Sequence, residues 1–273
     1  MDDAFVINGK GYKVADLNTI VDTLVENKQL NRTNGKVSAS DLASVLNVMV
    51  KYEAYKQFRD RIGFEDDAAI AKKIQEAADK DTTFAKYPKV MQDLLIGLNI
   101  AEGTLTDGGI PDSSVIKSLY EKSPVSSGVL CLSHILVKTL AEARDVLKDL
   151  NEGASWKDEA KAKTIDPSGK DNGGALTDEG KTCQTLVNAQ AVYDADFVRG
   201  AIAGKAGVPT GPVKTQFGYH IILNAAYDDV AKDIEVPLAK NPLQYMLTGF
   251  MASSDIRVAT TYGSWDAVSS SIK

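Results

Sequence analysis

Cysteine and histidine are scarce in this sequence, which holds two of each among 273 residues. Cys131 and Cys183 form no Cys-x-x-Cys pair, so a zinc site built on cysteines is not expected. On composition alone the two cysteines are interpreted as unpaired thiols. His134 and His220 could both be buried for packing in a protein of this size. The sequence therefore predicts no metal site.

Basic charge and long apolar runs are also lacking. The 31 Lys and Arg residues are outnumbered by 37 Asp and Glu residues, which gives a formal net charge of -6. Nucleic-acid binding relies on clustered Lys and Arg, so this balance argues against a nucleic-acid partner. No apolar run reaches the ~20 residues that a membrane-spanning helix needs. The segment Met1 to Phe5 lacks the basic region and apolar stretch of a signal peptide, so any export signal was either removed or never present.

The composition is that of a globular protein, with 44% hydrophobic and 25% charged residues. Its length fits one large domain or two ordinary ones, and either could bury a core. No nucleotide-binding or metal-binding motif occurs, so no cofactor is expected.

Helical periodicity dominates both ends of the chain. Residues 4–9 alternate and stop at Asn8-Gly9, which predicts a short strand and a turn. Ser38 to Asp41 form a capping box at the start of a helix. A late helix over Leu243 to Met251 and a short strand over Ile256 to Ala259 close the periodic part. Other apolar stripes at helical spacing predict helices near residues 14–24, 42–62, 67–79, 87–98 (ended by Gly103) and 111–120. These stripes are wider than one helix can hide alone, so we expect the helices to pack together.

The pattern changes after residues 124–128, whose Pro, Ser and Gly indicate a linker. A strand is predicted over 129–138, an amphipathic helix over 140–151 and a short strand after the Gly-rich turn 169–174. A polar stretch over 178–190, a short helix over 194–203 and two strands within 211–225 follow. The middle of the chain is therefore predicted to be an α+β module.

Four motifs follow one another in this module. They are Leu-Ser-His-Ile-Leu-Val at 132–137, Gly-Ala-Ser-Trp at 153–156, the run 166–170 with Gly173-Gly174, and Gly-Pro-Val-Lys-Thr-Gln-Phe-Gly-Tyr-His-Ile-Ile at 211–222. With them the module resembles the parvulin family of peptidyl-prolyl cis/trans isomerases. In that family they are similar to the first strand, the glycine-aromatic turn, the run before the second strand and the consensus of strands three and four.

The resemblance implies both the chemistry and its residues. An X-Pro bond turns slowly, because amide resonance gives a barrier of about 18–20 kcal/mol. The site needs an apolar slot for the proline ring and polar groups that favour a twisted amide, and no covalent attack. By resemblance the catalytic positions are His134, Asp166 and His220, and the substrate-binding positions are Leu176, Tyr193, Phe197, Thr215 and Phe217.

Two readings of these residues stay open. The histidine pair is either a hydrogen-bonded pair that holds the strands together or, with the acid, a general acid/base system, although isomerisation needs no net proton transfer. Phe197 and Tyr193 are either pocket residues or simply core.

The sequence also departs from the family pattern. The family's Asp and aromatic residue are missing from the second strand, Tyr193 replaces a methionine, and the loop 180–192 is long. An inactive parvulin domain that only binds peptides is therefore the alternative. Lys138-Thr139, the link between the first strand and the next helix, lacks the cluster of basic residues that a phosphate-binding site needs. No preference for phosphorylated Ser/Thr-Pro is therefore expected.

The flanking segments resemble those of SurA-like and PrsA-like extracytoplasmic foldases. The strand, helices, parvulin domain and late helix follow the same layout, and residues 255–266 are similar to the end of such lipoproteins from high-GC Gram-positive bacteria. The resemblance implies an exported protein that binds unfolded or partly folded proteins and proline-containing peptides. It implies membrane attachment only through an N-terminal lipid anchor that this sequence does not contain.

The sequence thus predicts an α+β protein in which a mostly helical, discontinuous chaperone domain (1–127 and 228–273) carries an inserted parvulin domain (128–227). The parvulin domain is expected to be a small antiparallel sheet with surrounding helices. The predicted function is an extracytoplasmic foldase that isomerises X-Pro bonds. The alternatives are a chaperone with an inactive parvulin domain and an assembly factor dedicated to one partner.

Three pairings are expected in space. The strand Phe5–Ile7 should pair with Ile256–Ala259, since neither can bury its apolar face alone. The helix over 243–251 should pack on the N-terminal helices. The resemblance makes the first two parvulin strands antiparallel neighbours, so Cys131 and Cys183, just past the end of the second strand, should lie close enough for a disulfide. Two free thiols remain the alternative.

Overall fold

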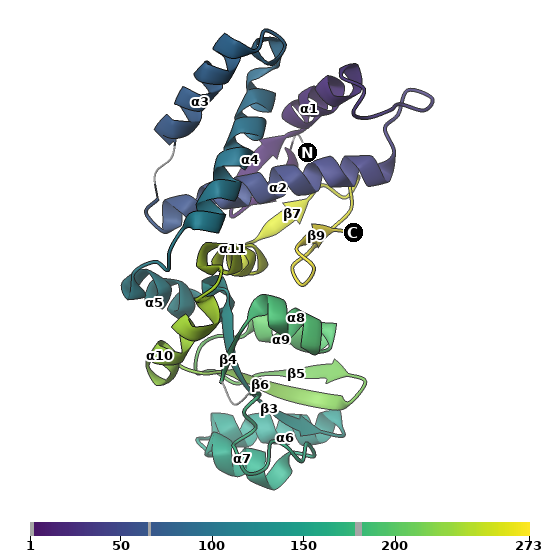
Figure 1. Ribbon diagram of the computed structural model, residues 1–273. Helices are drawn as coiled ribbons and strands as arrows, with labels where there is room; N and C mark the ends of the chain where they lie inside the picture. Colours follow the sequence, from purple (N-terminus) through teal and green to yellow (C-terminus); the bar gives the residue numbers. More distant parts are fainter. Residues whose placement is uncertain (1–2, 65–66, 178–181) are drawn as a thin grey trace. The chain divides into compact units, whose positions relative to one another are not determined.

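The computed structural model describes residues 3–64, 67–177 and 182–273. They form two compact units, each built around its own core. We call residues 1–108 with 254–273 the terminal unit, because both ends of the chain build it, and residues 109–253 the central unit. Figure 1 shows their elements in chain order. Helices and small antiparallel sheets make up both units, as the α+β prediction requires.

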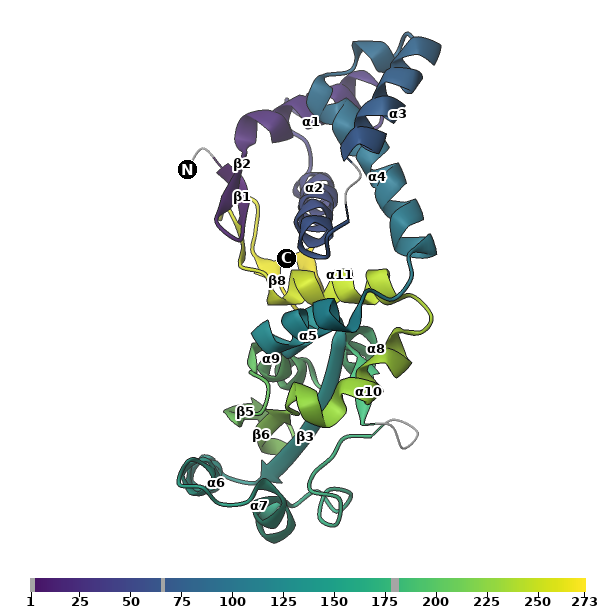
Figure 2. The ribbon, with the colours of Figure 1, turned by 90° about the vertical axis from the view of Figure 1, so that its left-hand side faces the viewer.

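The terminal unit begins with a hairpin, β1 (Asp3–Ile7) and β2 (Lys10–Lys13), turned at Asn8-Gly9. β7 (Ile256–Val258) adds to the other edge of β1, with Phe5 opposite Val258 and Ile7 opposite Ile256. The predicted pairing of the two chain ends is therefore confirmed, and Figure 2 shows the yellow C-terminal segment beside the purple hairpin. A separate two-stranded ribbon joins β8 (Trp265–Asp266) and β9 (Ser271–Ile272).

Helices make up most of this unit. They are α1 (Val14–Glu26), α2 (Ala39–Arg61), α3 (Asp67–Lys80), the 3-10 turn η1 (Phe84–Lys86) and α4 (Lys89–Asp107). Of these, α1 and α2 pack on β1, and α3 packs on α4 and η1. The predicted cap is present: Oγ of Ser38 accepts a hydrogen bond from the backbone N–H of Asp41 over 3.1 Å. The predicted end of α4 at Gly103 is wrong, because the helix continues through this glycine to Asp107. Fully buried core residues of the unit include Phe5, Ile7, Leu17, Leu46 and Phe58.

The central unit is organised by one antiparallel sheet with the strand order β4-β3-β6-β5. Its strands are β3 (Val129–Val137), β4 (Cys183–Thr185), β5 (Thr210–Thr215) and β6 (Gly218–Asn224). Its helices are α5 (Ser113–Lys122), the 3-10 turn η2 (Pro124–Ser127), α6 (Leu140–Asn151), α7 (Trp156–Lys163), α8 (Leu186–Val192), α9 (Ala195–Ala203), α10 (Tyr227–Leu238) and α11 (Pro242–Ser253).

The second strand differs from its prediction. After the Gly-rich turn, the chain makes only an isolated bridge between Ala175 and Ser133. The strand that pairs with the first half of β3 is β4, which lies in the stretch expected to be polar loop, as does α8. Asp178 and Glu179, which complete the predicted strand, lie outside the described residues.

The division into units also differs from the predicted domain boundaries. Residues 109–127 and 228–253 were expected in the helical domain, and the structure assigns both to the central unit. The 243–251 helix was predicted to pack on the N-terminal helices; within the central unit, α11 packs on η2, β3 and α8. Two glycines explain this contact: a Cβ at Gly249 would collide with the carbonyl of Val125, and one at Gly128 with the carbonyl of Tyr245. α11 therefore lies backbone to backbone against the turn that leads into β3.

Candidate active site

A pocket of about 430 Å³ opens on the sheet of the central unit. Residues from β3, β6, the segment before the Gly-rich turn and the α8–α9 junction meet there. Its lining residues are His134, Leu136, Ile165, Asp166, Pro167, Leu176, Val192, Tyr193, Asp194, Phe197, Phe217 and His220. The structure thus brings together seven of the eight site positions that the sequence suggested, and the eighth, Thr215, lies behind His220.

The two histidines face each other across paired strands. His134 lies on β3 and His220 on β6, and their rings stack with centroids 5.2 Å apart. Their Nδ1 atoms are 3.0 Å apart. The other nitrogen of His134, Nε2, lies 2.8 Å from Oδ2 of Asp166. Both rings are buried, so these hydrogen bonds fix their orientation.

Asp166 is held as a carboxylate. Burial alone would raise its pKa, but hydrogen bonds from Ser168 and His134 outweigh burial and hold the pKa below the usual value. The backbone N–H and the hydroxyl of Ser168 both donate to Oδ1 of Asp166, over 3.0 and 2.7 Å. The carboxylate therefore accepts a hydrogen bond from Nε2–H of His134.

His220 is neutral at physiological pH. Burial, and then the neighbouring His134, lower its pKa from 6.5 to about 4. In a neutral pair with Nε2–H of His134 directed at Asp166, Nδ1 of His134 is the acceptor and Nδ1–H of His220 the donor. Nε2 of His220 is then an acceptor, and Oγ1 of Thr215 lies 2.8 Å from it and donates.

Thr215 does not belong to the pocket surface, in contrast to the prediction that it binds substrate. It is 5% exposed, and its hydroxyl accepts a hydrogen bond from the backbone N–H of Phe217 over 3.2 Å while donating to His220. A single directed chain of hydrogen bonds therefore runs from Phe217 N–H through Thr215, His220 and His134 to Asp166. Thr215 sets the orientation and tautomer of His220.

The approach of the Gly-rich turn to His134 requires a glycine. Gly174 has φ +73°, and a Cβ there would collide with the carbonyl of His134. The carbonyl of Gly174 accepts a hydrogen bond from the backbone N–H of His134 over 2.8 Å. This contact brings Leu176 to the pocket wall, where its backbone N–H donates to the carbonyl of Leu132 over 2.8 Å.

Aromatic side chains give the pocket its apolar character. Phe197 on α9 is 3% exposed and its ring lies edge-on to both histidine rings, with centroids 5.8 and 5.1 Å away. Tyr193 packs against Phe197 at 5.4 Å. Phe217 is 63% exposed and stands at the rim. The arrangement provides an apolar slot, with Phe197 at its base, that is the size of a small ring and its neighbours.

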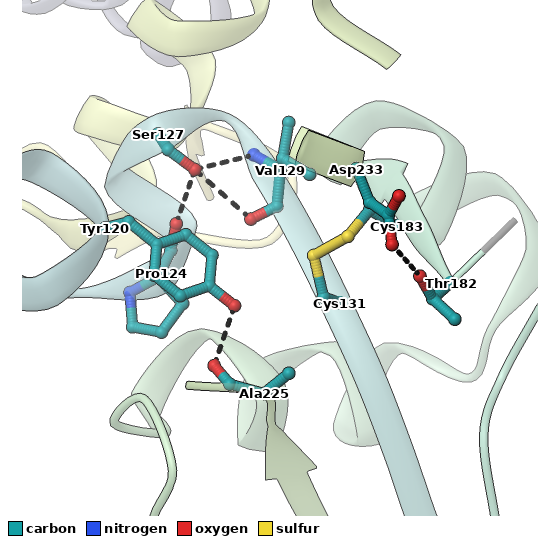
Figure 3. Close-up of a disulfide and its surroundings, with 9 residues drawn as sticks. All are labelled: Tyr120, Pro124, Ser127, Val129, Cys131, Thr182, Cys183, Ala225 and Asp233. Carbon is teal, nitrogen blue, oxygen red and sulfur yellow. Dashed lines mark hydrogen bonds between the residues drawn. A yellow bond between two sulfur atoms is a disulfide. The ribbon is translucent and has the colours of Figure 1, made fainter. Parts of the chain in front are cut away.

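A disulfide joins two neighbouring strands of the same sheet. Cys131 of β3 and Cys183 of β4 are directly opposite each other and are joined, with an S–S distance of 2.00 Å (Figure 3). Next to Cys183, the hydroxyl of Thr182 donates to Asp233 of α10 over 3.0 Å. Both cysteines are buried, and Cys183 lies within β4 rather than past the end of a strand.

Sequence reasoning missed five lining residues. Leu136 shares the face of His134 two positions along β3, and strand alternation could have identified it. Ile165 and Pro167 flank Asp166 in sequence. Val192 and Asp194 adjoin Tyr193, but no pattern in the sequence marked either of them.

Neither a metal site nor a membrane span is found in the described residues. No group of three or more His, Cys, Asp or Glu side chains within 3–64, 67–177 and 182–273 is arranged to hold a metal ion. Across the same residues, no helix has both the length and the apolar composition needed to cross a bilayer.

Comparisons with known proteins place the pocket within one domain family. Residues 134–225 match the family model of the PPIC-type PPIase domain, also called rotamase. The foldase protein PrsA of Clostridium kluyveri is 42% identical over 119 residues, which cover 43% of this chain and 32% of that protein. PrsA of Clostridium botulinum strain Hall is 32% identical over 193 residues, which cover 65% of this chain and 54% of that protein. The chain thus spans a third to about half of the length of these curated relatives.

Solved structures with similar chains were also found. The crystal structure of PrsA from Bacillus subtilis covers 94% of this chain and 95% of its own, at 23% identity and a TM-score of 0.33. The solution structure of NmPin, the parvuline of Nitrosopumilus maritimus, covers 37% of this chain and 98% of its own, at 28% identity and a TM-score of 0.32.

Proposed function

We propose, from the premise that residues 134–225 are a parvulin-type PPIase domain, that this chain catalyses cis/trans isomerisation of X-Pro bonds in unfolded or partly folded polypeptides. The observation that carries the proposal is the pocket itself. An apolar slot closed by Phe197 lies directly against a hydrogen-bonded His134–His220 pair. That combination is what the reaction asks for: a place for the proline ring beside fixed polar groups.

The slot would act by differential binding. In water the planar amide is stabilised by resonance and by solvation of its carbonyl. Inside an apolar pocket that solvation is lost, while the proline ring can stay packed against Phe197 and Tyr193 as the amide twists. The twisted state is then bound better than the planar one, and each ~1.4 kcal/mol of such preference gives a tenfold rate increase.

The histidine pair serves this pocket as a positioning device. Each of its four ring nitrogens has a hydrogen-bond partner within the chain: the two Nδ1 atoms pair with each other, and the Nε2 atoms face Asp166 and Thr215. Hydrogen bonds within the chain thus engage all four nitrogens. This supports the interpretation that the pair locks β3 to β6 and orients the pocket floor, rather than the one in which it moves a proton.

For the whole chain we propose the role of an extracytoplasmic foldase. Three exposed apolar residues, Ile165, Val192 and Phe217, surround the pocket, and they would hold apolar residues that flank the proline of an unfolded client. The similarity to PrsA foldases supports the same role. A buried disulfide suits an oxidising compartment. Attachment through an N-terminal lipid anchor, in a longer form of the protein, completes the proposal.

The test is the rate of cis/trans exchange in a proline tetrapeptide, measured by NMR exchange spectroscopy with and without the protein. We expect acceleration, and a loss of about 10- to 100-fold in kcat/KM for Phe197→Ala, because about 2 kcal/mol of ring contact disappears from the slot. Phe84→Ala, a matched truncation in the terminal unit, should keep full activity.

The controls separate the alternatives. Thermal unfolding of each variant establishes that it is folded at the assay temperature. No acceleration at high protein concentration, with peptide binding retained, would favour a chaperone whose parvulin domain only binds. Acceleration limited to one client among unrelated unfolded proteins would favour a dedicated assembly factor.

A further inference from the structure

Among the described residues, acidic side chains line the pocket, but no Lys or Arg does. The lining includes the carboxyl groups of Asp166 and Asp194. His220 is neutral at physiological pH, because its pKa is lowered to about 4. Lys214 also acts on His220, but its Nζ lies over the ring of Tyr219, 4.6 Å from the ring centroid, and Lys214 does not line the pocket.

The two carboxylates differ in the hydrogen bonds that they accept. Asp166 accepts from His134 through one oxygen and twice from Ser168 through the other. Asp194 caps α9 with Oδ1 alone, which accepts the backbone N–H of Asp196 over 2.9 Å. The negative charge of Asp194 acts on His220, where it opposes the lowering of the pKa. The carboxylate of Asp194 therefore lines the pocket while its Oδ1 atom caps the N-terminus of α9.

The residues around Asp194 strengthen the interaction of its charge with a charged ligand. Asp194 is half-buried and lines the pocket together with Val192, Tyr193 and Phe197, so aliphatic and aromatic side chains share the pocket with it. A charge beside apolar walls interacts with a ligand charge more strongly than one on an open surface. A bound polypeptide would thus find an apolar slot for its proline and a fixed carboxylate at the edge of that slot.

From these observations we propose that Asp194 sets the substrate preference of the site, which favours X-Pro segments that carry a cationic side chain next to the proline. Lys and Arg neighbours are attracted, whereas Glu and phosphorylated neighbours are repelled. The inference rests on the proposed function, because it specifies the sequence context of the same slot. It assigns a role to a residue that otherwise serves only as a helix cap.

The experiment compares peptides that differ in one charge. Two tetrapeptide series, Ala-Xaa-Pro-Phe and Ala-Ala-Pro-Xaa, carry Lys, Gln or Glu at Xaa. For each peptide kcat/KM is measured by exchange spectroscopy and Kd by chemical-shift titration, at low and at high ionic strength. We expect a Lys-over-Glu preference of about two- to fivefold in at least one series, as for a partly solvated ion pair, that weakens in high salt.

Two variants remove the charge and keep the cap. Asn and Ser are N-cap residues as good as Asp, so Asp194→Asn and Asp194→Ser should leave α9 intact. In both, the Lys/Glu ratio should fall to about one. Asp196→Asn is the matched control, because Asp196 lies on the same helix, pairs with Arg199 and does not line the pocket. It should keep the wild-type ratio.

Each outcome decides between the two proposals. Acceleration of all peptides with equal values for Lys and Glu would overturn the preference and leave the isomerase proposal standing. A protein that binds the peptides with the charge preference but does not turn them over would support the preference and contradict isomerase activity. Equal Kd values, or no binding at all, would overturn the preference whatever the rates.

Discussion

The side-chain amide of Gln184 donates a hydrogen bond to the hydroxyl of Tyr193 over 2.8 Å. Gln184 is the residue after Cys183, and its carbonyl oxygen in turn accepts from the side-chain amide of Asn188 on α8 over 2.9 Å. The disulfide to Cys131 thus fixes the short strand whose next side chain positions one wall of the pocket. Gln184 therefore connects the disulfide at Cys183 to Tyr193 in the pocket wall.

Breaking the disulfide should affect both stability and the slot. Removing the bridge in Cys131→Ala/Cys183→Ala frees a loop of sequence separation 52, which costs about 4 kcal/mol in the chain-entropy model. We expect lower stability in denaturant titrations and a changed environment for Tyr193, seen as an altered ring NMR signal. Reductant should reproduce both effects in the native protein and have none on the double variant. A ring signal unchanged in the double variant would show that β4 keeps its place without the bridge.

Acidification should destabilise the central unit through His220. Its folded-state pKa of about 4 lies below its ordinary 6.5, so the unfolded chain takes up the proton first as the pH falls. The contribution to stability is complete above pH 6.5 and is lost as the pH falls toward 4, with an upper limit of about 3 kcal/mol. Asp166, whose pKa is lowered, loses its own contribution in a separate window below its ordinary 3.8.

The measurement is the free energy of unfolding as a function of pH, from 7 down to the acid midpoint. His220→Gln has no imidazole at this position and should show a flatter curve between pH 6.5 and 4. Parallel curves for the variant and the native protein would place the titrating group elsewhere.

Thr215→Val should disturb His220 without touching the pocket surface. The substitution keeps the side-chain shape but leaves Nε2 of His220 and the N–H of Phe217 without their partner, which costs about 1–3 kcal/mol. The imidazole nitrogen shifts in a ¹⁵N spectrum should report a loss of the Nδ1–H tautomer of His220. Thr215→Ser retains the hydroxyl and should restore the native tautomer. If Thr215→Val kept that tautomer, the hydrogen bond from Thr215 would not be what selects it.

Neighbouring positions on β7 should respond in opposite ways. Ile256 is buried opposite Ile7, so Ile256→Ala should destabilise the terminal unit by about 2–5 kcal/mol. Arg257 points to the other face, and its ion pair with Asp255 is exposed, so Arg257→Ala should change stability by less than about 1 kcal/mol. Thermal unfolding of both variants compares them directly. Equal effects would mean that the register of β1 and β7 differs from the one described.

Local motifs allowed much of this fold to be predicted. The cap at Ser38, the turn at Asn8-Gly9 and the strand around His134 depend on residues close together in the sequence, and the structure has all three. The pairing of β1 with β7 is not local, but neither strand could bury its apolar residues alone. That need for a partner made the prediction possible.

The remaining features depend on contacts that no local pattern records. The helix over 243–251 was apolar on one side, but its neighbour was decided by Gly128 and Gly249, which admit the turn before β3. Thr215 was assigned to the pocket by resemblance to the parvulin family, whereas its hydroxyl faces inward to His220. The sequence predicted a short helix from Asp194 but gave no sign that this residue lines the pocket, because the packing of α9 against the sheet is not local.

The pairing of β1 with β7 also dictates an order of assembly. Asn8 at the end of β1 and Asp255 before β7 share a hydrogen bond although 247 residues separate them. A ribosome adding about 5–20 residues per second needs roughly 12–50 seconds to make that span. Throughout that interval β1 lacks its partner β7, and the whole central unit, residues 109–253, is synthesised before β7 appears. The first strand to be synthesised can pair with β2 at once but gains its second partner only at the end, and until then the backbone N–H and C=O groups on that edge stay unpaired.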